Sequence, residues 1–293
     1  MIVFLITIYQ IISSHSILQD WERVPDQASG EFRPGQAVTI DTDKEYSVHI
    51  ELIGSTSAGK TTLARKMVET GKQQGLDIFL SDEFILQQAH ITWVKNEFIR
   101  RRLIEAISFT VSLTCLRRYR EFIEFVLREG KSTPGSWIYK INRIRNVIRK
   151  IGIFEFISRR SGSKHIVLAD NEGLLQGVHN LFVHQNSRAD LQKISRYVEL
   201  APLPDVVLYL QQEEEVLVAR TLGRGHARVT GNSPDKVLYF IRQAIAAFDE
   251  VTRAPKVHDR LLIVDGRLII QQESENLSNP NFYRVTELVQ PGL

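Results

Sequence analysis

Cysteine is almost missing from this chain of 293 residues, in which Cys115 is the only one. Because a disulfide needs two cysteines, neither an intramolecular disulfide nor a multi-cysteine metal site can form. Cys115 stands in an apolar, helix-like context with Val111, Leu113 and Leu116. This composition fits a reducing compartment best, so we expect a cytoplasmic protein.

Long hydrophobic runs are also scarce. The apolar run at positions 1–12 is too short for a membrane-spanning helix, which needs about 20 residues. It has no Lys or Arg before Arg23, unlike a secretory signal, although Ser13, Ser14 and Ser16 resemble a cleavage site. Besides a signal or anchor, this run can be interpreted as a buried strand, a partner-binding extension or a misassigned start. We expect no transmembrane segment.

Excess charge is small, with a formal net charge of +3, and alone does not argue for a nucleic-acid or membrane partner. Its distribution is uneven, because residues 100–160 hold 15 Lys and Arg against 5 Asp and Glu and the rest of the chain is net acidic. The eight histidines show no metal-ligand spacing, so we expect them to be structural or exposed.

Strand and helix patterns alternate along most of the chain. Short strand patterns occur at 47–53, 77–80, 165–169, 205–210 and 261–264, with helix patterns between them. This alternation predicts a three-layer α/β fold with a central parallel sheet. The long connection between the second and third strands predicts a basic helical insertion over 86–160, broken at 131–136. No fixed-period repeat is present, which excludes a solenoid.

Three regions follow from composition. Residues 20–45 mix Asp, Glu, Gly and Pro without periodicity, so we expect an N-terminal extension over 1–45. The ordered domain is expected over 46–275, with a tail segment over 276–293.

The strongest motif joins the first strand to the next helix. Residues 54–61 match G-x-x-x-x-G-K-[ST] without a mismatch, and such a loop cradles nucleotide phosphates with backbone N–H groups, its lysine and a Mg²⁺-binding hydroxyl. We therefore expect ATP and Mg²⁺ as cofactors. The expected nucleotide-binding residues are Gly54, Ser55, Thr56, Ser57, Ala58, Gly59, Lys60, Thr61 and Thr62, with Thr61 also on the metal and Lys60 also catalytic.

A GTPase is the first competing interpretation, because residues 170–173 match D-x-x-G after a strand. However, the chain reads Gln211-Gln212-Glu213-Glu214 where the guanine-reading N-K-x-D should stand, and that motif occurs nowhere in the sequence. ATP is favoured over GTP.

Three blocks of sequence resemble the P-loop nucleoside and nucleotide kinases, most closely thymidylate kinase-like proteins. They are the phosphate loop, the block 204–210 with the arginines that follow it, and Leu262-Ile263-Val264-Asp265-Gly266. The resemblance covers about 48–85 and 165–270. It implies phosphoryl transfer from ATP to a small-molecule acceptor, with Asp265 near the adenine.

The resemblance also implies an arginine-bearing lid over 220–232. Arg220, Arg224 and Arg228 would stabilise the charge that develops on the transferred phosphate, and the glycines at 223, 225 and 231 would let the segment move. The alternative is a basic helix end that complements the helix dipole. The sequence leaves open which arginine touches phosphate.

Carboxylates follow two of the strands. Asp82 and Glu83 come after the second strand, at the edge where such folds bind ligands, and one of them would accept the proton of the acceptor hydroxyl. The alternative is that they cap the next helix. Asp170 ends the third strand and resembles the carboxylate that holds Mg²⁺, with Glu172 as its alternate.

The insertion is least like the family. Its clusters Arg100-Arg101-Arg102, Arg117-Arg118-x-Arg120 and Arg143-x-Arg145-x-x-x-Arg149-Lys150 fit a substrate phosphate, a polyanion or an anionic surface, or simply a solvated basic face. The acceptor indicated is a nucleoside or nucleoside monophosphate, then a sugar or sugar-linked metabolite. An ATPase switch acting on a protein or nucleic acid, and a kinase-like protein without turnover, are the alternatives. A nucleic-acid partner is not favoured, and a homodimer is left open.

Overall fold

The computed structural model describes residues 47–133, 135–160, 165–170, 173–225, 229 and 233–267. The predicted extension at 1–45 and tail at 276–293 lie outside the described residues, as do Glu172, Arg228 and most of the predicted lid after 225.

Five parallel strands form the central sheet in the order β2-β3-β1-β4-β5. They are β1 (Val48–Ile53), β2 (Ile78–Leu80), β3 (Ile166–Ala169), β4 (Val206–Gln211) and β5 (Leu261–Asp265). Each predicted strand is confirmed to within one residue at either end. Because all strands are parallel, every loop that follows a strand meets at the carboxyl edge of the sheet.

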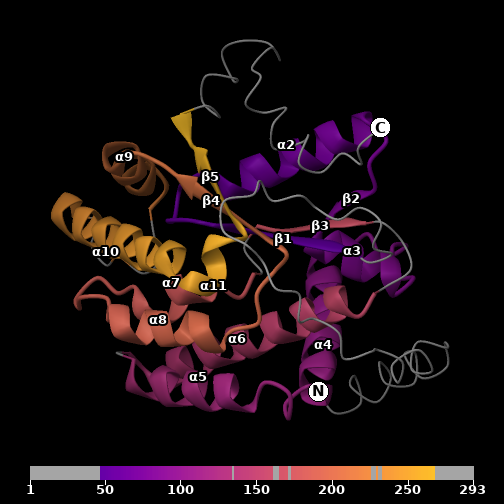
Figure 1. Ribbon diagram of the computed structural model, residues 1–293, viewed down its shortest axis with the longest axis horizontal. Helices are drawn as coiled ribbons and strands as arrows, with labels where there is room; N and C mark the ends of the chain where they lie inside the picture. Colours follow the sequence, from indigo (N-terminus) through magenta and orange to yellow (C-terminus); the bar gives the residue numbers. More distant parts are fainter. Residues whose placement is uncertain are drawn as a thin grey trace.

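Helices flank the sheet, which confirms the predicted three-layer α/β class (Figure 1). Helix α2 lies on one face, and α6, α7 and α8 lie on the other. The helices are α2 (Lys60–Gln73), α3 (Ser81–Gln88), α4 (Glu97–Thr114), α5 (Arg120–Ser132), α6 (Trp137–Ser158), α7 (Gly177–Phe182), α8 (Leu191–Leu200), α9 (Glu214–Arg224), α10 (Pro234–Arg253) and α11 (Pro255–His258).

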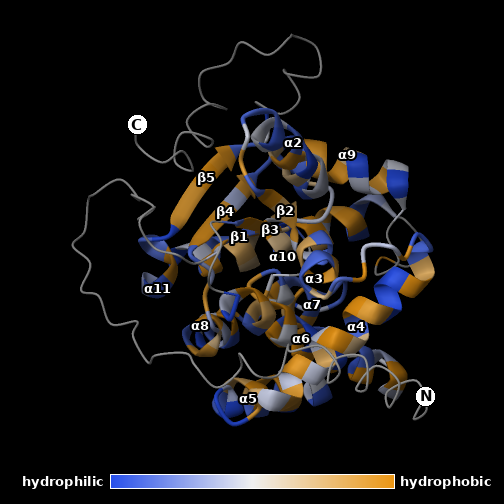
Figure 2. Cartoon of the chain, turned by 90° about the vertical axis from the view of Figure 1, so that its right-hand side faces the viewer, coloured by the Kyte–Doolittle hydropathy of each residue, from blue (hydrophilic) through white to orange (hydrophobic). Residues whose placement is uncertain are grey.

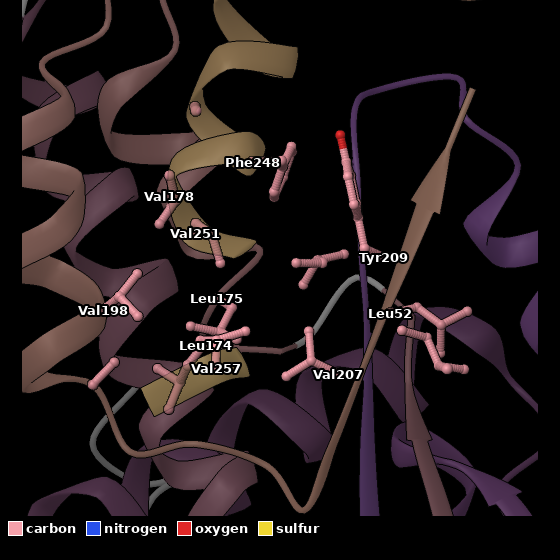
Figure 3. Close-up of a cluster of buried hydrophobic side chains, with 14 of the residues drawn as sticks. Leu52, Leu174, Leu175, Val178, Val198, Val207, Tyr209, Phe248, Val251 and Val257 are labelled. Carbon is pink, nitrogen blue, oxygen red and sulfur yellow. The ribbon is translucent and has the colours of Figure 1, made fainter. Parts of the chain in front are cut away.

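The main core packs on both faces of the sheet and includes residues of α2 and of α10. Phe248 and Val251 of α10 face Tyr209 and Val207 of β4, with Leu174 beside them (Figure 3). Figure 2 shows β5 almost wholly in the hydrophobic colour, as expected for a strand of a parallel sheet. Strand β5 itself is only partly buried. Strands β1, β3 and β4 are buried almost continuously, and their burial fixes the carboxyl edge in place.

The predicted helical insertion is confirmed as α3 to α6. It builds its own apolar cluster from Phe84 of α3, Ile107 of α4 and Phe156 of α6, packed on Val167 of β3. Helices α4 and α6 approach closely at Gly152, where an added Cβ would lie 1.7 Å from the Ser108 carbonyl oxygen. The insertion is therefore part of the folded body.

Among the described helices, none combines the length and the apolar character that crossing a membrane requires. The apolar run at 1–12 lies outside the residues that the structure describes.

Candidate active site at the carboxyl edge of the sheet

The phosphate loop runs from β1 to α2 with the backbone that its glycines allow. Gly54 has φ 143°, and an added Cβ there would lie 2.8 Å from the Leu210 carbonyl oxygen. Gly59, with φ 101°, is the residue before the first turn of α2, and Ser57 also has positive φ at 61°. Such conformations are costly for most residues, so Gly54 is fixed by the close approach of β4.

The start of α2 suits an anion. No side chain caps it, and its first turn holds no acidic residue. The first N–H groups of a helix have no partner within the helix, and the dipole there favours negative charge. The sequence thus leaves this helix end to a ligand rather than to its own side chains.

Lys60 is buried and folded onto the loop. Its Nζ donates to the carbonyl oxygens of Gly54 at 2.9 Å and Ser55 at 2.8 Å. Burial lowers its pKa to about 8, the nearby charge of Asp170 opposes this shift, and the charge of Lys150 adds to it. A buried ammonium of this kind interacts strongly with an incoming anion.

Asp170 follows β3 and lies near Lys60. Ala169 pairs with Glu51 in β1, so the next residue emerges beside the last part of β1. The charge of Asp170 acts on the pKa of Lys60, which places the carboxylate within electrostatic reach of the loop lysine. The structure therefore brings Lys60 and Asp170 into the same region of the carboxyl edge, and the role of Asp170 at Mg²⁺ stays a prediction.

Helix α9 contacts the phosphate loop directly. Arg220 Nη1 donates to the Ser57 carbonyl oxygen at 3.3 Å, and Thr221 Oγ1 donates to Ser57 Oγ at 3.1 Å. Arg224 is exposed at the end of the helix. Of the three predicted lid arginines, Arg220 is the one that the structure places on the loop, and Arg228 lies outside the described residues.

The two carboxylates after β2, Asp82 and Glu83, both lie in the first turn of α3, which has no side-chain cap hydrogen bond. Glu83 lies 4.0 Å from Lys72 Nζ, in the last turn of α2. That turn is about 18 Å along the helix from Lys60. The Glu83 carboxylate is therefore turned away from the loop.

Asp265 ends β5 and pairs in register with Gln211. Its carboxylate accepts from Arg267 Nη2 at 2.7 Å and from the Arg267 backbone N–H at 2.9 Å. These hydrogen bonds lower the pKa of Asp265. The residue lies at the expected edge, but its carboxylate is already held by Arg267.

The phosphate loop is supported by Gln176 and Glu51, which the sequence did not single out, and by Lys150, which it named only in a basic cluster. Gln176 bonds Gly54 with both ends of its amide, at 3.3 Å each. Its backbone N–H donates to Glu51 Oε1 at 2.7 Å, and Lys150 Nζ donates to the Gly173 carbonyl oxygen at 2.8 Å. The one signal in the sequence was Glu51, a carboxylate inside an apolar strand.

Glu51 and Lys150 are both buried, with 0% and 1% exposure. Burial raises the pKa of Glu51 to about 7, while the Gln176 N–H and the charge of Lys150 pull in the other direction. Gly173 must be glycine here, because an added Cβ would lie 1.9 Å from Glu51 Cδ. The insertion thus reaches the phosphate loop through Lys150 of α6.

The residues near the loop fit Mg²⁺ bound together with phosphates. Mg²⁺ prefers oxygen ligands and commonly takes only one or two from the protein, with waters and phosphate oxygens completing the shell. Thr61, in the first turn of α2, offers a hydroxyl, and Asp170 offers a carboxylate close to Lys60. Within the described ranges, no cluster of three or more His, Cys, Asp or Glu forms a metal site made by protein alone.

The comparisons with known proteins give distant matches. No family model matches the chain, and no curated protein matches it. Solved structures of deoxyadenosine kinase from M. mycoides are similar to 78% of this chain. The dATP-bound structure is 13% identical over 100% of its own chain with a TM-score of 0.34. The dCTP-bound structure is 12% identical over 99% of its own chain, with a TM-score of 0.33. The structure with dCMP and a flexible dCDP is 15% identical over 98% of its own chain, with a TM-score of 0.36. At these values the likeness does not decide the activity.

Proposed function

We propose that the protein is an ATP-dependent kinase that transfers the terminal phosphate to a small-molecule acceptor, a nucleoside or nucleoside monophosphate. The observation that carries the proposal is the position of Arg220, which α9 holds against the loop that also carries Lys60. A guanidinium beside a phosphate loop stabilises the charge of a phosphoryl group in transfer. The complete phosphate-loop motif and the resemblance to thymidylate kinase-like proteins agree with this chemistry.

Bound MgATP would supply the phosphoryl group and the metal charge that neutralises its oxygens. The Lys60 ammonium would exchange the carbonyls of Gly54 and Ser55 for phosphate oxygens, which are stronger acceptors. Thr61 and Asp170 would hold Mg²⁺. The N–H groups at the start of α2 would bind the phosphates, and Arg220 would leave Ser57 for the transferred group.

On the acceptor side, Asp82 is the residue that we assign to orient the attacking hydroxyl or phosphate. It follows β2 at the carboxyl edge, where the strands of such sheets present their ligands. Glu83 is less suited, because it faces Lys72 at the other end of α2.

The first experiment tests the nucleotide site with Lys60→Ala. We expect this variant to lose MgATP binding in equilibrium dialysis, because a loop without its lysine leaves phosphate charge unneutralised. Lys72→Ala is a matched control on the same helix, since its side chain is half exposed in the last turn of α2. Unchanged MgATP affinity in Lys60→Ala would contradict the assignment.

The second experiment tests the reaction with an ADP-release screen across nucleosides, nucleoside monophosphates and sugars. A kinase releases ADP when its acceptor is present and little without it. Rapid hydrolysis with no acceptor, or hydrolysis that only a protein or nucleic acid stimulates, would instead support the ATPase-switch alternative.

A further inference from the structure

Arg143 of α6 is a buried cation whose described hydrogen-bond partners are a hydroxyl and an imidazole. The residue is only 7% exposed. Nη2 donates to the Tyr139 hydroxyl at 2.7 Å, and Nη1 lies 3.2 Å from Nδ1 of His184. The guanidinium carbon also stands 4.1 Å from the centre of the Tyr139 ring.

The positive charge of Arg143 has no carboxylate to compensate it among the described residues. A guanidinium does not lose its proton in proteins, so burial leaves the charge in place. Two other arginines of the insertion lie beside a carboxylate: Arg145 lies 4.0 Å from Glu105, and Arg159 lies 2.6 Å from Glu155. A buried charge is normally paired or bound to a ligand, and the described residues supply no anion for Arg143.

The position of Arg143 is on the reaction side of the sheet. One turn further along α6, Val147 Cγ2 lies 3.8 Å from the Cβ position of Gly177, which follows the Gln176 that bonds Gly54. The same helix later passes His49 in β1, where Phe154 packs at 5.4 Å between ring centroids. Helix α6 therefore runs from the carboxyl edge toward the start of β1, and its Arg143 end lies on the side of the phosphate loop.

We propose that Arg143, with Tyr139 and His184, binds an oxyanionic group of the acceptor, a phosphate monoester, so that the acceptor is already phosphorylated. This inference rests on the proposed kinase function and narrows its acceptor from a nucleoside to a monophosphate. The guanidinium fork can bind two phosphate oxygens at once, and the Tyr139 hydroxyl can donate to a third. The imidazole of His184 holds the fork from the α7 side.

Inorganic phosphate is the probe for the test. The protein is first saturated with a non-hydrolysable MgATP analogue, so that the phosphate loop is occupied, and phosphate binding is then followed by calorimetry. We expect saturable binding at one site in the parent and about tenfold or greater weakening in Arg143→Gln. Arg143→Lys keeps the charge without the fork and should be intermediate. Arg145→Gln, an exposed position two residues away, should equal the parent.

The rise in melting temperature that phosphate produces distinguishes phosphate binding by Arg143 from a purely structural role. A structural role lowers the melting temperature of Arg143→Gln and leaves the phosphate-dependent rise intact, which would overturn the proposal. Equal phosphate affinity in parent and Arg143→Gln, or no saturable binding in the parent, would also overturn it. Saturable binding of acetate without binding of phosphate would refute the phosphate monoester.

The last part of the test measures ADP release with pairs of acceptors. Each pair consists of a phosphate monoester and its dephosphorylated counterpart. The monoester should support ADP release, and the neutral counterpart should not. If analogue binding and Arg143-dependent phosphate binding persist but no acceptor yields ADP, the anion site stands and the kinase proposal fails. If neutral acceptors react as well as their monoesters, the kinase proposal stands and this inference fails.

Discussion

The lowered pKa of Lys60 predicts that MgATP binding is coupled to proton uptake. In the free protein this pKa is about 8, mainly because of burial. Phosphate oxygens around the ammonium would return the pKa to its ordinary value near 10.5 or above. The protein must then take up a proton to bind MgATP above pH 8. The affinity for MgATP is therefore constant below about pH 7.5 and falls as pH rises through the Lys60 pKa of the free protein.

The expected size follows from linkage between the two pKa values. Affinity at pH 9.5 should be roughly 30-fold weaker than at pH 7, and binding at pH 8.5 should take up about 0.75 proton. Titration calorimetry in two buffers of different ionisation enthalpy measures both quantities. The second phosphate pKa, near 6, lies below this window, and the raised pKa of Glu51 lies at its lower limit.

Lys60→Arg is the matched control for this coupling. Its guanidinium stays charged throughout the range, so the variant should bind with no dependence on pH above 7.5. A flat profile in the parent would refute the buried, low-pKa lysine. The same slope in parent and Lys60→Arg would show that another group takes up the proton.

The remaining predictions concern the network, the lid helix and the insertion. Because the folded-state pKa of Glu51 is about 7 against its ordinary value of 4.5, its ionisation costs stability increasingly as pH rises from 4.5 to 7. The free energy of unfolding of Glu51→Gln should therefore rise relative to that of the parent by up to about 3 kcal/mol over that window, measured by urea unfolding at each pH. A difference in unfolding free energy that does not change with pH would contradict the raised pKa of Glu51. Arg220→Ala should lower kcat by about a hundredfold with a smaller effect on ATP affinity, whereas exposed Arg224→Ala should be nearly unchanged; the reverse order in steady-state kinetics would remove Arg220 from this role. Gly152→Ala should lower the unfolding free energy by about 1–3 kcal/mol or more, because its Cβ meets the backbone of α4, and an unchanged melting temperature would show that the two helices can separate there.

The sheet and the loop were predictable because both depend on short-range sequence. Runs such as Val48–Ile53 and Val206–Gln211 are mostly apolar and almost continuously buried, which is typical of a strand covered on both faces. The phosphate loop is contiguous, and its glycines are required by backbone geometry at Gly54 and Gly59. Local pattern and tertiary structure therefore agree in these segments.

The support of the loop was not predictable, because it joins residues far apart in the chain. Gln176 and Gly54 are 122 positions apart, and Arg220 and Ser57 are 163 apart. The charge clusters of the insertion were ambiguous for the same reason. Most of these arginines are solvent-exposed, as the simplest interpretation held, but Arg143 and Lys150 are buried, and helical spacing alone does not separate them.

The buried charges suggest how the donor and acceptor sides of the site are joined. Lys150 of α6 bonds Gly173 and interacts with both Glu51 and Lys60 through charge. Seven residues earlier, two turns along the same face of α6, stands Arg143. Helix α6 thus carries Lys150, which acts on the nucleotide loop, and Arg143, for which we propose an anionic ligand. A helix packed as tightly as α6 at Gly152 holds these two charges at a fixed spacing, which is what transfer between two bound phosphates requires.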